Sequence, residues 1–429
     1  MLTTRQSLAF GLGLTAIVIA ACSGPSGASP LDGTGSPNAT NGGPHDGKQG
    51  ARRHAPGSNS PPVAGSGIFG APLAELTAAE LKDFADGLEE FQNQETPEGG
   101  LGPIYNNTGC FVCHSSPAVG GSTSIRVTRF GKLTAGVFDP LSSRGGSLLQ
   151  SSSIDLAAQE IVPADANVAA FRQSTPLFGM GLIEAIDDST IIENASRSGV
   201  TGVRGTVAFV TDVTTGKSRV GRFGWKAQVA TLLHFAGDAY VNEMGITSRF
   251  FPEENAPNGD LARLAASDHV ADPEDQVDPI TGKGDIDHAA DFMRLLAPPP
   301  ALAAAQSGAG DAIFRATGCA DCHTPSMKTG ASAVAALSHR EVRLDSDLLL
   351  HDMGSLGDGI AQGAATATQM KTAPLWGARA SGPYLHDGRA TTIDGAILAH
   401  AGEAAASRNR YAALSSDEQR HLQDYVNAL

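Results

Sequence analysis

Residues 110–114 read C-F-V-C-H, and residues 319–323 read C-A-D-C-H. A C-x-x-C-H string is the attachment signal of c-type haem: the two thiols bond to the macrocycle, and the histidine becomes an iron ligand. A zinc site is the alternative, but it needs further ligands close by, and the sequence has no other cysteine pair. The sequence therefore predicts two covalently bound haem c groups, attached by Cys110, Cys113 and His114 and by Cys319, Cys322 and His323.

The fifth cysteine, Cys22, ends an apolar leader. Residues 1–21 are short for a membrane-spanning helix and are typical of a signal peptide. The string I-A-A-C at 19–22 is similar to a bacterial lipoprotein cleavage site, so we expect Cys22 to be lipidated; an ordinary secretory signal is the alternative. Because Ser23 follows, the expected location is periplasm-facing, lipid-anchored and at the outer membrane. Residues 22–70 are rich in Gly, Pro, Ser and Asn, which predicts a disordered tether.

Helical patterns dominate the rest of the chain. A capping box at 77–80 opens one helical run, and S-D-E-Q opens a closing helix over 416–429. Two short runs, 206–210 and 219–223, flank a turn and predict a small β-hairpin insertion. The predicted fold class is therefore mainly α, with long loops.

The two halves repeat one plan, which duplication explains better than chance. After each haem string comes a T-P-L or A-P-L step, then Gly-Arg, then an Ala-rich helical run with a histidine, His234 in the first half and His400 in the second. Three prolines at 298–300 break the chain between the halves. We therefore expect one domain over 71–300 and another over 301–429.

The charge of the chain restricts its partners. The formal net charge is −15 at pH 7. A strongly acidic chain repels phosphate-rich surfaces, so nucleic acid and anionic lipid are excluded as expected partners. A basic redox partner would suit it.

Five strings make the chain similar to a known family. They read T-P-L-F-G-M-G-L-I-E-A-I at 175–186, G-R-F-G-W-K-A at 221–227, E-M-G-I-T at 243–247, L-H-D-M-G at 350–354 and G-P-Y-L-H-D-G-R at 382–389. Together they resemble the bacterial di-haem cytochrome c peroxidase superfamily, in particular its di-haem oxidoreductase branch, also labelled thiol oxidoreductases. The resemblance spans about residues 75–429 and implies two tandem cytochrome c-like haem domains.

The resemblance also implies roles for individual residues. In the family, electrons enter at the C-terminal haem and pass to the N-terminal haem, where peroxide is reduced. Glu243 matches the family's acid/base glutamate, and His386 matches a histidine beside the C-terminal iron. The family's second ligand to that iron is a methionine, but His400 stands at its position, which predicts a bis-histidine iron of lower potential. His234 competes as a ligand to the N-terminal iron, because the repeat aligns it with His400.

Trp225 is expected beside the haems, since a tryptophan assists electron transfer between them in the family; a packing role is the alternative. The family also holds calcium. Ser381 and Pro383 match two of its ligand positions, whereas Gly179 replaces an asparagine, so the sequence permits calcium without requiring it. Expected partners are a peroxide or other small-molecule substrate and a periplasmic electron donor such as a small cytochrome or cupredoxin. The alternative function is a pure electron carrier with both irons six-coordinate.

Overall fold

The computed structural model describes residues 67–302 and 308–429. The predicted leader, Cys22 and most of the predicted tether lie outside these residues. These described residues belong to one unit of mutually contacting segments. The expected domain boundary at 298–300 stays a prediction.

Helices supply about a third of the described structure, and most are short. They are α1 Ala78–Phe91, α2 Cys110–Cys113, α3 Met180–Glu184, α4 Asp188–Asn194, α5 Leu232–Ala239, α6 Leu261–Ser267, α7 Asp285–Leu295, α8 Ala309–Thr317, α9 Ile393–Leu398, α10 Ala405–Ala412 and α11 Ser416–Ala428. The capping box predicted at the start of α1 is confirmed, because Thr77 Oγ1 accepts from Glu80 N and the Glu80 carboxylate accepts from Thr77 N. The closing helix α11 is confirmed too, with Ser415 as its cap.

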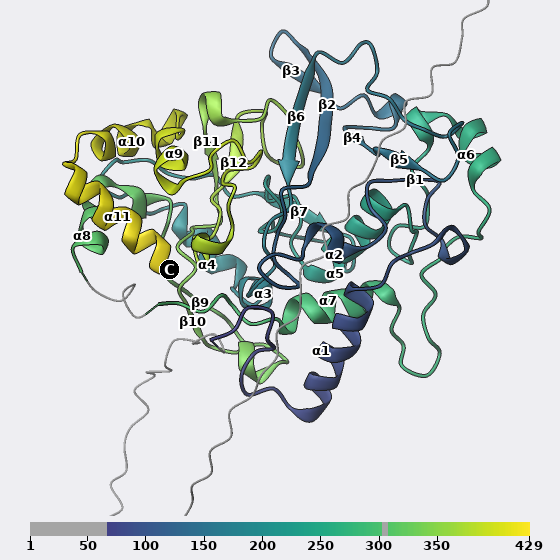
Figure 1. The fold of residues 1–429 in the computed structure, drawn as a ribbon, viewed down its shortest axis with the longest axis horizontal. Coiled ribbons are helices and arrows are strands. Elements are labelled where there is room, and N and C mark those ends of the chain that lie inside the picture. The colour runs from purple at the N-terminus through teal and green to yellow at the C-terminus, as the bar shows by residue number, and fades with distance from the viewer. Residues whose placement is uncertain (1–66, 303–307) are drawn as a thin grey trace, which may run out of the picture. The chain divides into compact units, whose positions relative to one another are not determined.

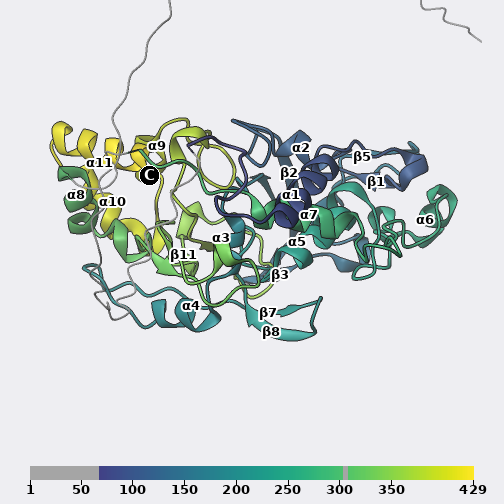
Figure 2. The ribbon, with the colours of Figure 1, turned by 90° about the horizontal axis from the view of Figure 1, so that it is seen from below.

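Small antiparallel sheets connect these helices (Figure 1). The strands are β1 Ile104–Tyr105, β2 Arg126–Thr134, β3 Val137–Asp139, β4 Leu148–Leu149, β5 Ser152–Ser153, β6 Val168–Gln173, β7 Phe209–Asp212, β8 Lys217–Val220, β9 Met327–Lys328, β10 Glu341–Val342, β11 Leu350–Asp352 and β12 Gln369–Lys371. The predicted hairpin is confirmed as β7–β8, which projects from the edge of the view in Figure 2.

The fold class is mixed rather than mainly α. The described residues are 34% helical and 16% strand. The helical prediction missed the ladder between β2 and β6, which are paired from Arg126↔Gln173 to Gly131↔Val168. The alternation of β6 is the reverse of the usual one, because Phe171 is 50% exposed and Arg172 only 5% exposed. The strand therefore lacks the pattern of buried apolar and exposed polar residues by which a strand is predicted.

The described residues contain two large apolar cores and a third small cluster of Ala208, Ala227, Leu350 and Ala365. In the first, α1 crosses α7 where Gly87 approaches the backbone so closely that an added Cβ would lie 2.4 Å from His288 O. Phe91 and Phe292 stack across that crossing with ring centroids 4.7 Å apart. The second core joins α8 to α9, α10 and α11, at the yellow end of the chain in Figure 1. Residues 327–349 of the expected second domain pack into the first core.

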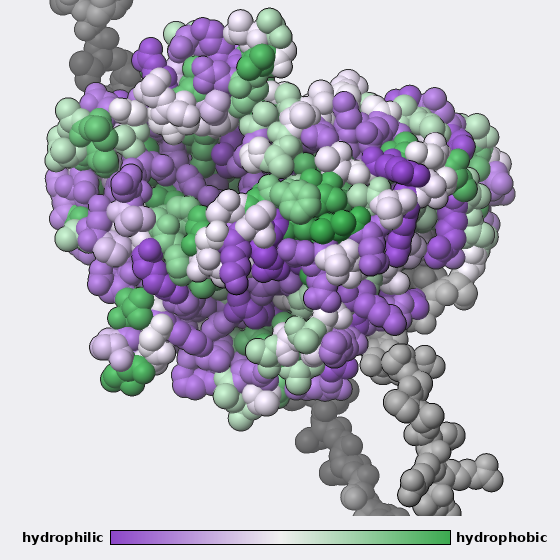
Figure 3. All heavy atoms as spheres, turned by 180° about the vertical axis from the view of Figure 1, so that it is seen from behind, coloured by the Kyte–Doolittle hydropathy of each residue, from purple (hydrophilic) through white to green (hydrophobic). Residues whose placement is uncertain are grey.

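Hydrophilic side chains cover much of the face shown in Figure 3, and apolar ones gather there in separate patches. Within the described residues, none of the helices combines the length and apolar character needed to cross a bilayer.

Candidate functional site

The first C-x-x-C-H string lies in the wall of a cavity of about 190 Å³. Its two cysteines begin and end the one-turn helix α2, and His114 follows directly as the C-cap. Cys110, Cys113 and His114 all line the cavity. The structure therefore brings together the three residues predicted to hold the N-terminal haem.

Glu243 lines the same cavity from a π-helical turn, Tyr240–Met244, that continues α5. Such turns are frequent at functional sites. The Asn106 side-chain amide donates to Glu243 Oε2 at 2.8 Å, and Asn107 Nδ2 lies 3.2 Å from Cys113 Sγ. Burial raises the pKa of Glu243 above its ordinary value, although the charge of Arg129 and then the Asn106 bond oppose the shift. The two asparagines, which the sequence did not single out, tie the carboxylate to the haem-attachment string.

His234 lies elsewhere. It sits in the first turn of α5, where Thr231 Oγ1 accepts from its main-chain N–H. Its ring is buried near the β7–β8 hairpin, with Nδ1 3.7 Å from Asp212 Oδ1, and it is not among the residues lining the N-terminal cavity. The placement favours Glu243 over His234 as the functional residue there.

A guanidinium in the same cavity has one nitrogen without a hydrogen-bond partner among the described residues, although its charge acts on Glu243 and Asp238. Arg129 Nε is buried and has no hydrogen-bond partner among the described residues, and Arg129 lines the cavity. Arg172 lines it too, paired with Asp358 at 2.6 Å. An unpaired buried donor is costly unless an acceptor reaches it. The carboxylates of a haem would be suitable acceptors, so this cavity fits the predicted group.

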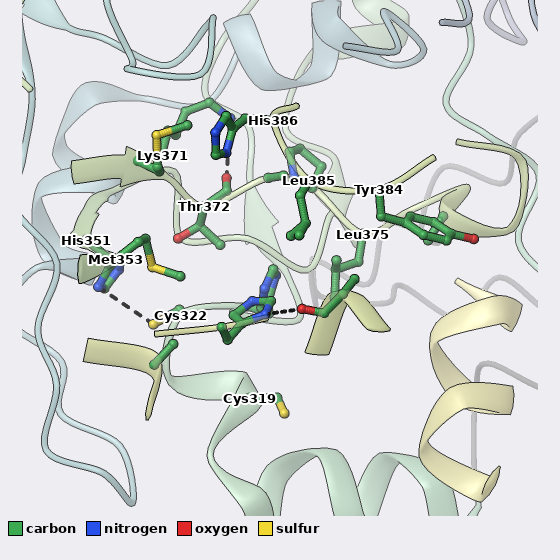
Figure 4. Close-up of a pocket in the computed structure, with 18 of the residues that line it drawn as sticks. Cys319, Cys322, His351, Met353, Lys371, Thr372, Leu375, Tyr384, Leu385 and His386 are labelled. Carbon is green, nitrogen blue, oxygen red and sulfur yellow. Dashed lines mark hydrogen bonds between the residues drawn. The ribbon is translucent and has the colours of Figure 1, made fainter. Parts of the chain in front are cut away.

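The second string lines a larger cavity of about 300 Å³. Cys319, Cys322 and His323 contribute to its wall, and His386 and His400 line it as well. Figure 4 shows the two cysteines on one side of this cavity and His386 on the other. The residues predicted for the C-terminal haem are thus assembled around one space.

Three of the predicted iron ligands share one arrangement. A main-chain carbonyl lies close to each Nδ1: Gly121 O at 3.0 Å from His114, Asp345 O at 2.9 Å from His323, and Ala396 O at 2.8 Å from His400. A carbonyl only accepts, so each Nδ1 carries the hydrogen and Nε2 is the nitrogen that would bind a metal; the His114 ring also meets the main chain of Thr175. This is how metal-binding histidines are commonly held.

Burial keeps these rings neutral, as a metal ligand must be. It lowers the pKa of His114 and of His323 to about 4, and it lowers that of His400 as well. The residues at both cavities therefore fit two c-type haems.

The four cysteines do not suit thiol chemistry. Cys110, Cys113, Cys319 and Cys322 are all free. Burial raises the pKa of Cys110 and of Cys113 to about 12, whereas a reactive thiol has a depressed pKa. In the described ranges, the one cluster of acidic, His or Cys side chains with metal-ligand spacing is Glu254, Asp268 and Glu274, so neither cysteine pair belongs to a zinc-type set.

Two loops with matching backbone geometry line the C-terminal cavity. Phe223 bridges Val229, and Tyr384 bridges Ala390, each across six residues. The next residue has positive φ in both loops: 76° at Gly224 and 73° at Leu385. This matching makes Trp225 the counterpart of His386, and the two rings meet edge to face with centroids 6.3 Å apart.

Trp225 lines both cavities, and its indole N–H donates to Gln173 O at 2.9 Å. His386 is 3% exposed and lines the C-terminal cavity. The repeat therefore places one residue of each half at the boundary between the two cavities.

The oxygen atoms associated with calcium are engaged by the protein itself. The Ser381 hydroxyl donates to Gly377 O, and Pro383 O accepts from the Gln173 side chain. Gly179 packs against Trp376, where an added Cβ would lie 2.8 Å from the indole ring. Calcium at these residues stays a prediction.

A model of the family described as "Di-haem oxidoreductase, putative peroxidase" matches residues 150–429. The match includes the second haem string, Trp225, Glu243 and His400, and it begins after the first haem string. No curated protein matches the chain.

Two solved structures resemble the chain at low sequence identity. The hydrazine synthase of Kuenenia stuttgartiensis is 14% identical, with a TM-score of 0.37 over 90% of this chain and 100% of that chain. A MauG-like protein associated with microbial copper homeostasis is 15% identical, with a TM-score of 0.29 over 63% of this chain and 92% of that chain. TM-scores this low do not establish a common fold.

Proposed function

Because this chain belongs to the di-haem oxidoreductase family, we propose that it is an exported two-haem oxidoreductase that reduces a peroxide. In this proposal electrons enter at the C-terminal cavity and pass to the N-terminal cavity, where the peroxide is reduced. Each haem would supply a one-electron redox centre, and the N-terminal one also a site at which peroxide binds.

The difference between the two cavities carries this proposal. The capping threonines of α5 and α9 align the two halves of the chain. His400 lies eight residues after Thr392, the cap of α9. The residue eight positions after Thr231, the cap of α5, is Ala239. His400 lines the C-terminal cavity and Ala239 lines the N-terminal one. The structural counterpart of the second histidine ligand is thus an alanine, which cannot bind iron; in this proposal, a coordination position of the N-terminal iron is left for the substrate.

Glu243 would move the proton in this cavity. Cleavage of a peroxide requires a proton to pass from one oxygen to the other, and a carboxylate within reach can carry it. Asn106 fixes one oxygen of Glu243 at 2.8 Å, and burial raises its pKa toward neutrality. A buried carboxylate held by one amide, with the charges of Arg129 and Asp238 acting on it in opposite directions, is suited to exchange a proton.

Trp225 and His386 would mark the route between the cavities, since they touch at that boundary. Two histidines on the C-terminal iron imply a low potential, which matches ordinary high-potential donors poorly, so we propose a small periplasmic cytochrome of low potential as the donor. Anchoring through Cys22 at the outer membrane remains part of the proposal; it falls on residues outside the described ones.

Turnover of hydrogen peroxide by the haem-loaded protein tests the proposal. With an artificial electron donor, we expect steady peroxide consumption and one exchangeable coordination position per molecule. A protein that is reduced and reoxidised but consumes no peroxide, with both irons closed to cyanide, would be the pure electron carrier instead.

A further inference from the structure

His351 is a buried charged residue for which the proposed function has no role. It lies in β11, is 3% exposed and lines the C-terminal cavity. Its Nε2 is 2.9 Å from Asp347 Oδ2, and its Nδ1 is 2.8 Å from Glu403 Oε2. Cys322 Sγ lies 3.7 Å from the same Nδ1, as the dashed line in Figure 4 marks.

These contacts fix the protonation state of the ring. A carboxylate only accepts hydrogen bonds, and a neutral imidazole has a single N–H. Because both ring nitrogens face carboxylate oxygens, both must carry hydrogen, and His351 is an imidazolium. Burial is the largest single influence and lowers its pKa, but the hydrogen bonds and charges of Asp347 and Cys322 together outweigh burial and raise the pKa to about 11.

The two carboxylates come from different parts of the chain. Asp347 is buried just before β11 and also accepts from Leu349 N at 3.0 Å. Glu403 belongs to the short helical turn Gly402–Ala404, three residues after His400, and its side chain is 35% exposed. The imidazolium therefore joins the segment that carries His400 to β11.

Backbone packing holds the same two segments together. Gly402 has φ of 56° and lies so close to β11 that an added Cβ would be 2.2 Å from Asp352 O and 2.6 Å from Gly354 N. Only glycine tolerates both that conformation and that contact. Asp352 Oδ1 in turn accepts from Gly354 N at 2.8 Å.

We propose that His351 is a positioning residue for the C-terminal haem: its imidazolium, bonded at both nitrogens, holds the 399–404 segment against residues 351–354 and so keeps His400 in place. The inference rests on the proposed function, because it takes His400 as an iron ligand. It explains the L-H-D-M-G string at 350–354 as the surface on which the segment 399–404, which carries His400, packs.

The test measures the C-terminal iron in the haem-loaded protein. His351→Phe removes both bonds, Glu403→Gln weakens one, and His351→Lys keeps a cation that can donate to both carboxylates. His421→Gln changes an exposed histidine of α11 and is the control. The readouts are the low-spin electron paramagnetic resonance signal of this iron and its accessibility to cyanide.

We expect His351→Phe to lose part of the low-spin signal and to bind cyanide at the C-terminal iron. Glu403→Gln should lose a smaller part of the low-spin signal and bind less cyanide. His351→Lys should recover much of the signal, and the control His421→Gln should match the parent in both readouts. If His351→Phe does not fold or load haem, Glu403→Gln decides by the same readouts.

The positioning role alone would be overturned if His351→Phe kept the parent signal and stayed closed to cyanide while His400→Ala lost the signal. Glu403→Gln takes the place of His351→Phe in this comparison if the latter does not fold or load haem. If His400→Ala also keeps the signal, then the ligand assignment of the proposed function fails, and the positioning role fails with it.

Discussion

Replacing Glu243 by glutamine removes the proposed proton carrier and little else. Glutamine has the same shape, and its amide oxygen can still accept from the Asn106 side chain, which donates to Glu243 Oε2 at 2.8 Å. The main-chain bond from Asn106 N to Glu243 O, also 2.8 Å, is untouched. The substitution therefore leaves the cavity intact and takes away the ionisable oxygen.

Positioned acid–base groups contribute roughly 10²–10⁴-fold to rates. We therefore expect Glu243→Gln to lower kcat/KM for hydrogen peroxide by about 10²–10⁴-fold, which is about 2.7–5.5 kcal/mol in the barrier. Because burial raises the pKa of Glu243 above the ordinary 4.5, the parent activity should rise with pH through that elevated pKa, and this limb should vanish in the variant.

The assay is peroxide consumption by the haem-loaded protein across pH, with the optical spectrum as a check on both haems. Glu160→Gln is the matched control, since Glu160 is a buried carboxylate that accepts two main-chain N–H groups and does not line either cavity. Activity of Glu243→Gln within about threefold of the control would refute the proton-transfer role, because the expected minimum loss is about 10²-fold.

Three further substitutions test other parts of the structure. Trp225→Phe should slow electron transfer between the haems in stopped-flow measurements while both haem spectra stay unchanged; an unchanged rate would remove Trp225 from the route. Lys226→Met breaks one of the two buried pairs of Asp358, 2.9 Å apart, while Arg172 keeps the other; it should lower the free energy of unfolding by about 1–3 kcal/mol in denaturant titrations, against less than about 1 kcal/mol for the exposed Lys82→Met. Burial and neighbouring carboxylates raise the pKa of Glu254 to about 10, so folding favours its protonated form, and this contribution to stability is lost as the pH rises from about 4.5 toward 10. Glutamine is neutral at every pH. In chelator-treated buffer, Glu254→Gln should therefore raise Tm by at least about 2 °C at pH 9 and leave it nearly unchanged at pH 4. Equal effects at both pH values would contradict that shift.

Local sequence signals predicted the parts of the structure that local chemistry determines. The C-x-x-C-H strings identified two cavities because the cysteines and the histidine are adjacent in the chain. The capping box at Thr77 predicted the start of α1 because both of its hydrogen bonds join residues three apart. The family resemblance is confirmed by the family model over residues 150–429.

Other features depend on contacts that no local pattern reveals. Asn106 meets Glu243 across 137 positions of sequence, so the pair appears only once the chain is folded. His234 and His400 lie in similar strings, which suggested equivalent roles. The two histidines occupy different positions on their helices, however: His234 lies three residues after the cap Thr231, whereas His400 lies eight residues after the cap Thr392. The hydrogen bonds of the caps, rather than matching letters, align the two halves.

Electron paramagnetic resonance of the oxidised, haem-loaded protein, recorded with and without cyanide, tests most directly the claim that the two haem sites differ. We predict one low-spin signal that cyanide leaves unchanged and that His400→Ala abolishes, together with a second iron whose signal shifts when cyanide binds. Two low-spin signals that are both unaffected by cyanide, or a parent-like spectrum in His400→Ala, would contradict the account.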